Sequence, residues 1–320
     1  ETKVVETDLF ASHEQALGRS FGSITQGAID RELLTIHPDM QWIPLYRLLV
    51  QPEARVVASF TGLVGDSGSG SSQLVYFRKE LQDRLGDDPA KWDTALSTRH
   101  ICKYSSQLNI AMAGVLMTTA YAFDNRSLLP PYLPALRGED TLWGMMLPAV
   151  NPLALLAGIP EILQHTPPGV RDAPISTSDI ICPSIEGLLG KMMQLAGGGP
   201  VLSSVSSRMK AIGEKIIELC DSQEYDSFAR SVVFATRYEQ IAMFEGALKK
   251  ARAPQLRRVL KSALNSMEKE IALPLATVPR ELLSQFGASE APSVCKAYCR
   301  RFGELVSWWP EVIKAATELR

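Results

Sequence analysis

Apolar residues recur three and four positions apart through most of the second half of the chain. This spacing places them on one face of an α-helix. It is seen in five segments: SIEGLLGKMMQLA, VSSRMKAIGEKIIELCDS, YDSFARSVVFATRYEQIAMFEGALKKA, PQLRRVLKSALNSMEKEIALP and VCKAYCRRFGELVSWWPEVIKAATELR. The breakers between them are GGGP at 197–200, Pro254, Pro274, Pro279 and Pro292. The pattern predicts an all-α bundle of four to six helices.

The first half of the chain mixes strand-like runs with helices. RVVASFTGLV at 55–64 is rich in valine and is followed by Gly-Asp, which predicts a strand and then a loop. IAMAGVLMTTAYAF at 110–123 is continuously apolar, so periodicity leaves a buried strand, a strand pair and a helix all open. GEDTLWGMML at 138–147 has two acids in its first turn and predicts a helix start. We therefore predict an α/β region at 1–170 followed by a helical domain at 171–320.

Prolines shape the stretches between these elements. The segment at 124–140, DNRSLLPPYLPALRGED, predicts an extended, rigid loop because proline fixes φ and lacks an N–H donor. The segment at 166–182, TPPGVRDAPISTSDIIC, predicts a linker or a lid. LWGMMLPAVNPLALLAGIP at 142–160 is the longest apolar stretch, and we interpret it as buried helix and turn because Pro148 and Pro152 interrupt it.

Composition narrows the class of protein. The chain is 46% hydrophobic and 21% charged, which is typical of a globular protein with a substantial core. Its net charge of −2 gives no general basic field, so we expect no nucleic-acid partner. No apolar run reaches the roughly 18–20 residues needed to span a bilayer. The five cysteines are scattered and odd in number, which favours reduced thiols and a cytoplasmic location.

Acidic residues stand at three places in the first half, each after an apolar run or a glycine: Gly65-Asp66, Asp124-Asn125-Arg126 and Gly138-Glu139-Asp140. Acids placed in this way can bind a sugar hydroxyl, deprotonate it, or hold a metal. A purely structural interpretation also fits. Glu139 and Asp140 could stabilise a helix N-terminus by about 0.5–2 kcal/mol. Asp124 could pair with Arg126 or Arg137.

The ordered set of GD at 65–66, DNR at 124–126, GED at 138–140 and H-x-x-P at 165–168 resembles the acceptor side of a GT-A glycosyltransferase. Family-2-type transferases are the most similar. The resemblance covers roughly residues 20–171. It implies a partial GT-A-like α/β fold and an inverting displacement, in which a sugar moves from a nucleotide-sugar donor to an acceptor hydroxyl.

The resemblance also implies roles for particular residues. Asp140 would be the general base, with Glu139 beside it. Sugar-binding residues would be Asp66, Asp124, Asn125 and Arg126. His165 would reach a divalent metal, Mn²⁺ or Mg²⁺, or the donor diphosphate, and Arg171 would balance phosphate charge.

The donor side of such an enzyme is not recognisable in these residues. GT-A enzymes carry an Asp-x-Asp metal motif, and no Asp-x-Asp occurs in this sequence. A glycine-rich phosphate loop of the Walker or Rossmann type is also absent from the sequence. We therefore expect the donor-binding half to precede Glu1 or to lie on a partner chain, and this chain alone to be inactive.

Two other function classes remain open. In the first, the chain is a non-catalytic interaction module whose helical half docks a partner, and the acids are helix caps. In the second, Ser67 in the run GDSGSG is the nucleophile of a hydrolase, which requires His100 or His165 within hydrogen-bond reach. The transferase predicts that Asp66, Asp124, Asp140 and His165 converge on one cleft.

Overall fold

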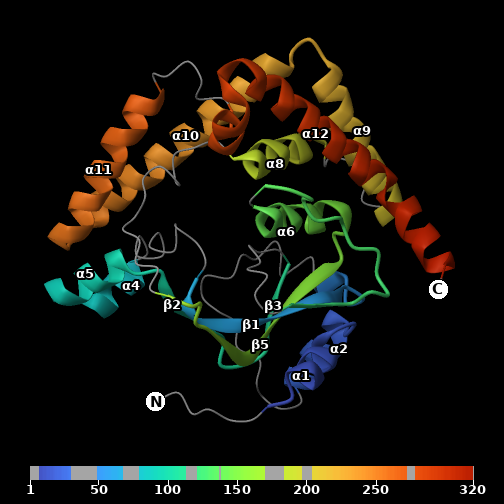
Figure 1. Ribbon diagram of the computed structural model, residues 1–320. Coiled ribbons are helices and arrows are strands. Elements are labelled where there is room, and N and C mark those ends of the chain that lie inside the picture. Colours follow the sequence, from blue (N-terminus) through green and yellow to red (C-terminus); the bar gives the residue numbers. More distant parts are fainter. Residues whose placement is uncertain are drawn as a thin grey trace.

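A mixed β-sheet lies between a pair of N-terminal helices and a larger helical region (Figure 1). The computed structural model describes residues 7–29, 49–67, 79–112, 121–136, 138–169, 184–196, 204–271 and 278–319. The predicted combination of an α/β region with a helical region is confirmed at this level.

The long strand β1 (Arg55–Asp66) organises the sheet. Along one edge it pairs in parallel with β5 (Ala154–His165). Along the other edge it pairs antiparallel with β4 (Tyr121–Phe123) and, closer to its end, with β2 (His100–Lys103). The short strand β3 (Asn109–Ala111) adds antiparallel to β5. The path β2-β1-β5-β3, with β4 also on β1, makes a five-stranded sheet.

The strand predictions were partly right. The predicted strand at 55–64 is confirmed as β1. The apolar run at 110–123 contributes the end of β3 at its start and β4 at its end; these two strands pair with β5 and β1, respectively. The interpretation of 142–160 as helix and turn was wrong in its second part, where β5 begins at Ala154. This part of β5 is buried and therefore apolar at every position, so it lacks the alternation that marks a half-buried strand.

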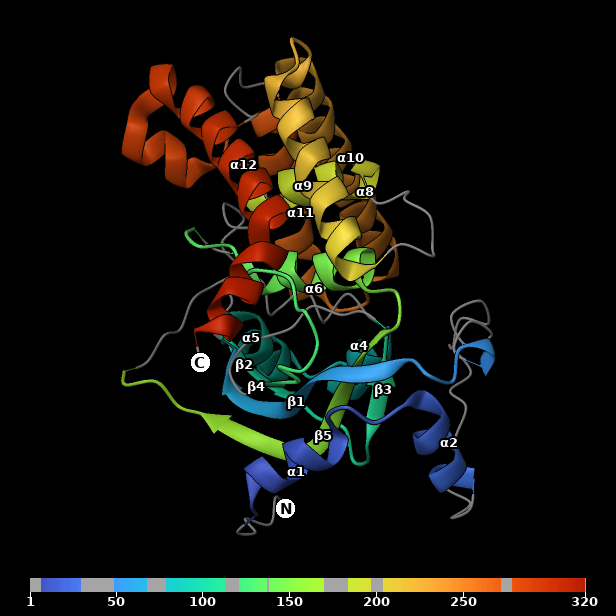
Figure 2. The same cartoon turned by 90° about the vertical axis from the view of Figure 1, so that its right-hand side faces the viewer.

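Each face of the sheet is covered by helices. α1 (Leu9–Ala16) and α2 (Phe21–Ile29) cover one face, where Ala16 and Phe21 pack with Val56 and Leu155. α6 (Glu139–Val150) covers the other, where Trp143 and Leu147 pack against the sheet. Figure 2 shows the sheet between α1 and α2 below and α6 above.

The helical region of the described chain contains five helices, within the predicted range of four to six. They are α8 (Ile185–Ala196), α9 (Val205–Asp221), α10 (Tyr225–Lys250), α11 (Pro254–Ile271) and α12 (Arg280–Glu318). α12 is kinked at Gly287. Pro292 lies inside α12 and not between helices, so its prediction as a breaker was wrong. Pro310 also lies inside α12.

α9 and α12 approach closely through two glycines. A Cβ atom built on Gly213 would collide with the carbonyl oxygen of Gly303 and would lie 2.5 Å from the backbone nitrogen of Ser307. A Cβ atom on Gly303 would lie 2.9 Å from Cγ2 of Ile216. The absence of side chains therefore sets the distance between these two helices.

α6 belongs to two apolar clusters. Trp143 and Leu147 point to the sheet, whereas Leu142, Met146 and Val150 join the core formed with α8, α9 and α12. A second contact between the sheet region and the helical region comes from α5 (Pro89–Ser97), which follows α4 (Lys79–Leu85) and packs on α10 and α11. The predicted domain boundary after residue 170 lies outside the described residues. Within the described chain, no helix combines the length and hydropathy required to cross a membrane.

Candidate functional site

The predicted residues Asp66 and His165 meet where β1 and β5 end. Gly65 is opposite His165 in the parallel ladder, and a side chain at Gly65 would collide with the His165 backbone. Nδ1 of His165 lies 2.6 Å from the main-chain oxygen of Asp66. A carbonyl oxygen only accepts hydrogen bonds, so Nδ1 carries the hydrogen. In the neutral ring Nε2 then holds the lone pair.

The carboxylate of Asp66 is buried beside a cation. Its side chain is 3% exposed, and Oδ1 lies 3.3 Å from Nε of Arg99. The N–H of Ser67 donates to the main-chain oxygen of Arg99 at 2.9 Å. The Ser67–Arg99 hydrogen bond holds the start of β2 against the end of β1. The Asp66–Arg99 ion pair offsets the free-energy cost of burying the Asp66 charge.

The geometry at the end of β1 does not favour Ser67 as a nucleophile. Ser67 is 6% exposed, which leaves little access for an external substrate. His165 directs Nδ1 to the Asp66 carbonyl, and His100 is an exposed residue opposite Asp66 in the antiparallel ladder.

The described residues do not by themselves fit the divalent metal that the resemblance implies. Nε2 of His165 could act as one ligand atom. Among the residues that the structure describes, however, no group of three or more His, Cys, Asp or Glu side chains is arranged to hold a metal ion. The carboxylate of Asp66 is already paired with Arg99. We therefore assign no chemical step to a metal at His165.

Asp124 forms a compact turn with Arg126. Nε and an Nη nitrogen of Arg126 donate to the two carboxylate oxygens of Asp124 at 2.6 and 3.1 Å, and the Arg126 backbone N–H donates at 3.2 Å. These hydrogen bonds lower the pKa of Asp124. Asn125 is exposed at the tip of the turn, and the Arg126 guanidinium lies against Gly18. The predicted pairing of Asp124 with Arg126 is confirmed; Arg137 lies outside the described residues.

The Asp124 turn is remote from Asp66 along the sheet. The backbone N–H of Asp124 donates to the carbonyl of Val57, near the start of β1. Asp66 follows nine residues later, a path of up to about 30 Å in an extended strand. The structure therefore brings Asp66 and His165 together but places Asp124 toward the opposite end of β1.

Glu139 and Asp140 occupy the first turn of α6, as predicted. The N-cap residue, Gly138, offers no side-chain cap, and Oδ1 of Asp140 accepts a hydrogen bond from the Thr141 N–H at 2.8 Å. Both acids are half-buried. The free N–H groups of the first turn stabilise negative charge at this position.

An aromatic cluster borders these two acids. Burial raises the pKa of Tyr132 to about 12, with further contributions from the charges of Asp140 and Glu139. Burial likewise raises the pKa of Tyr121, and the neighbouring Tyr132 and Asp140 add to the shift. The ring of Tyr132 stacks on Trp143 at a centroid distance of 5.6 Å. In the sequence, only the alternating aromatic residues Tyr121 and Phe123 point to this cluster, and they were not predicted as site residues.

A third acid, Glu186 of α8, also lies at the start of α6. Its Oε2 atom would be 2.6 Å from a Cβ atom on Gly138. Burial raises the pKa of Glu186, and the charges of Glu281 and Asp140 raise it further. Nothing in the local sequence of Glu186 indicates this location, because it depends on the packing of α8 against α6.

A buried polar cluster lies between α1 and the sheet. Nδ1 of His13 is 2.7 Å from Oγ of Ser59, and the Ser12 hydroxyl donates to Oε1 of Glu161 at 2.6 Å. Burial lowers the pKa of His13, while Glu161 acts in the opposite direction. Ser59 is fully buried within β1, so the pair His13 and Ser59 supports the packing of α1 and offers no accessible nucleophile.

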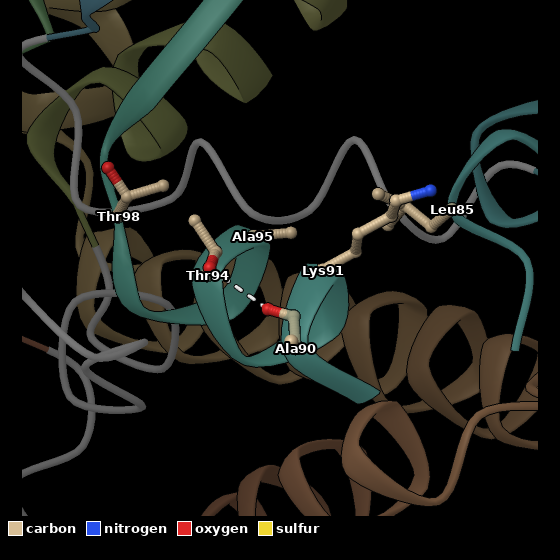
Figure 3. A pocket seen from close by; sticks show the side chains of 6 residues that line it. All are labelled: Leu85, Ala90, Lys91, Thr94, Ala95 and Thr98. Atoms are coloured by element: carbon tan, nitrogen blue, oxygen red, sulfur yellow. Dashed lines mark hydrogen bonds between the residues drawn. The ribbon is translucent and has the colours of Figure 1, made fainter. Parts of the chain in front are cut away.

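A shallow hollow of about 430 Å³ lies over α5 (Figure 3). Its lining is mainly apolar, and the Lys91 side chain extends across it toward Leu85. Its six lining residues are Leu85, Ala90, Lys91, Thr94, Ala95 and Thr98. None of the predicted site residues contributes to it.

Two sets of predictions remain partly outside the described residues. Arg171 and the predicted linker from residue 170 onward are not described. The described cysteines are free thiols, of which Cys102 is exposed and Cys220, Cys295 and Cys299 are buried. Cys182 lies outside the described residues.

Comparisons with protein-family models, with curated proteins and with solved structures find no match for this chain.

Proposed function

We propose that this chain is the acceptor side of a GT-A-like glycosyltransferase, with Asp140 as the general base. The observation that carries the proposal is the position of Asp140 in the first turn of α6, beside the half-buried Tyr121 and Tyr132. An acceptor hydroxyl arriving there meets a carboxylate at the border of an aromatic surface. This is a suitable environment for proton abstraction from a bound alcohol.

In the proposed reaction, Asp140 takes the proton of the acceptor hydroxyl as its oxygen attacks the anomeric carbon. The new carbon–oxygen bond forms on the face opposite the leaving group. The bond from the anomeric carbon to the diphosphate oxygen breaks, and the nucleoside diphosphate leaves with the electron pair. The helix N-terminus stabilises negative charge on Asp140, and Glu139 lies beside it in the same turn.

Asp66 and His165 form a second part of the proposed site, at the ends of β1 and β5. His165 presents Nε2 as an acceptor atom because Nδ1 is held by the Asp66 carbonyl. We leave Asp124 out of the proposed site, because both of its carboxylate oxygens bind Arg126 and it lies toward the other end of β1. Arg171 stays a prediction.

The proposal assigns donor binding to residues outside these 320. The sequence has no Asp-x-Asp, and the described residues provide no metal site. Calorimetric titration of UDP- and GDP-sugars, with and without Mn²⁺, tests this assignment. We expect no binding to this chain alone and binding to a form extended upstream or combined with its partner chain.

The role of Asp140 is tested by sugar transfer in the donor-binding form. Asp140→Asn should abolish transfer and leave the fold intact. Asp226→Asn is the matched control, because Asp226 is an exposed acid in the first turn of α10 and its loss has a similar effect on a helix N-terminus. Transfer that survives Asp140→Asn removes Asp140 from the mechanism.

Exposed apolar side chains support the interaction module as a second candidate. Phe234, Tyr238 and Met243 on α10, and Trp308 and Val312 on α12, are between 37% and 66% exposed. Phe234 and Tyr238 are four residues apart and share one face of α10, as Trp308 and Val312 do on α12. Contiguous exposed apolar side chains mark docking surfaces. If neither form binds a nucleotide-sugar, co-purification from the native source becomes the test. A partner that is lost with Tyr238→Ser or Trp308→Ser, and retained with Asp140→Asn, would favour the module.

A further inference from the structure

We propose that the acceptor is an uncharged saccharide, and that one of its rings lies on a surface formed by Phe60, Tyr104, Tyr121 and Tyr132 beside Asp140. This inference rests on the proposed transferase function and names its acceptor class. We call these four residues the aromatic platform.

The platform begins with a pair of rings on neighbouring strands. Phe60 of β1 and Tyr121 of β4 are directly opposite in the antiparallel ladder. Their ring centroids are 5.9 Å apart and the rings are tilted by 35°. Both side chains are half-buried, so each still has an accessible part.

Tyr104 extends the platform along β1. Gly62 follows Phe60 by two residues, across an irregularity in the pairing of β1 with β5. A Cβ atom on Gly62 would lie 2.7 Å from Cβ of Tyr104, so Tyr104 lies over the strand where β1 has no side chain. The Tyr104 side chain is 59% exposed, the largest exposure in the platform.

The rings are held rigidly from behind. Tyr121 stacks on Phe123 at 5.8 Å, and Phe123 meets Trp143 edge-on at 5.2 Å. Trp143 is 1% exposed, and its Nε1 donates to the main-chain oxygen of Pro130 at 2.9 Å. Tyr132 stacks on the same indole. A surface that is already ordered loses little conformational entropy when a ligand binds.

The chemistry of the platform matches a sugar ring. A pyranose has a flat face of C–H groups, which packs on aromatic rings, and a rim of hydroxyl groups, which donate to carboxylates. Asp140 is one helical turn before Trp143 in α6, and Tyr132 stacks on that indole, so the first-turn acids lie near the Tyr132 end of the platform. A lipid chain would gain nothing from these acids.

The acids at the start of α6 disfavour anionic acceptors. Glu139 and Asp140 lie in its first turn, and the Glu186 carboxyl lies against Gly138. A sialic acid or an acidic peptide would be repelled at this position. The same charge leaves neutral hexoses unaffected.

Saturation-transfer NMR on this chain tests the inference directly. The probes are cellobiose and lactose as neutral saccharides, N-acetylneuraminic acid as the anionic sugar, and decanol as the lipid. We expect signals from at least one neutral disaccharide and none from the anionic sugar or decanol. Tyr104→Ser and Tyr121→Ser should weaken binding about tenfold, the effect of losing one stacked ring.

Two variants control for indirect effects. Tyr121→Phe keeps the ring and should bind nearly as the parent does. Tyr238→Ser removes a tyrosine that is 61% exposed on α10 and should leave binding unchanged. If Tyr121→Ser fails to fold, Tyr104→Ser alone decides, because that side chain is largely exposed. Decanol binding without saccharide binding, or binding that neither platform variant weakens, overturns the inference.

The saccharide inference and the proposed function can fail separately. If disaccharides bind and Asp140→Asn leaves transfer intact in the donor-binding form, the platform stands and the proposed base is wrong. If Asp140→Asn abolishes transfer and all accepted substrates lack a sugar ring, the transferase stands and the acceptor class is wrong.

Discussion

Nδ1 of His165 donates a hydrogen bond of 2.6 Å to the main-chain oxygen of Asp66. The bond joins the ends of two parallel strands, β5 and β1, which are separated in the sequence by α4, α5, α6 and three short strands. It also defines which nitrogen of this ring is available to a ligand.

The tautomer of His165 is the first prediction. In its neutral form, the His165 ring should carry its hydrogen on Nδ1, because the carbonyl of Asp66 can only accept. Two-dimensional ¹H–¹⁵N spectra of the histidine rings at pH 8 distinguish the two tautomers. His100 is exposed and serves as the reference ring. An Nε2–H tautomer at His165 would contradict the hydrogen bond.

The stability of the protein should fall as the pH is lowered through the titration of His13. Burial lowers the pKa of His13 below its ordinary value of 6.5. The unfolded chain then binds more protons than the native state between these two pKa values, so the free energy of unfolding decreases as the pH falls below about 6.5. Urea unfolding between pH 8 and pH 5 measures this slope.

His13→Gln is the variant for that experiment, since glutamine keeps a polar group opposite Ser59 but does not titrate. It should flatten the slope by the contribution of one histidine. His100→Gln, which changes an exposed histidine, is the control for the loss of one imidazole ring. Equal slopes for the parent and His13→Gln would show that His13 has the same pKa in both states.

Gly18→Ala should destabilise the protein more than Gly86→Ala. Both glycines have positive φ, +75° and +60°, so alanine strains the backbone by about 1–2 kcal/mol at either site. Only at Gly18 does the new methyl group also meet the Arg126 guanidinium, which is bound to Asp124. Nothing lies within 4 Å of a Cβ atom on Gly86. Urea unfolding of both variants measures the difference, and Arg126→Ala should reduce it; Oδ2 of Asp124 still lies 3.2 Å from the added Cβ atom.

Gly213→Ala should also destabilise the protein, by about 1–3 kcal/mol, because the new methyl group meets backbone atoms of α12 that move only with the whole helix. Gly246→Ala is the matched control within a helix. A Cβ atom on Gly246 meets nothing within 4 Å, so alanine should stabilise α10 by about 0.5–1 kcal/mol. Thermal unfolding of the two variants gives the comparison; shifts of the same sign would contradict the close contact of α9 with α12.

Elements with a strong local pattern could be predicted from the sequence. β1 and α6 were found from a valine-rich run and from acids placed before an apolar stretch. The pairing of Asp124 with Arg126 was also predictable, because the two residues share one tight turn. In each case the cause lies within a few neighbouring residues.

Features that depend on tertiary packing were missed. β5 was interpreted as helix and turn because both of its faces are covered. The local sequence around His13 does not indicate burial, and the contact of α1 with Ser59 on the sheet buries this side chain. Phe60, Tyr104 and Tyr121 of the aromatic platform come together through strand pairing. The local sequence does not determine the register of such pairs.

α6 has a consequence for how the protein denatures. One side of this helix completes the core of the sheet, and the other side completes the core of the helical region. Neither region can lose its structure without exposing Trp143 and Leu147, or Leu142 and Met146, to water. On heating, the sheet and the helices should therefore unfold in one cooperative transition, with equal calorimetric and van't Hoff enthalpies. A fragment that ends before α8 should behave as a molten, aggregation-prone chain.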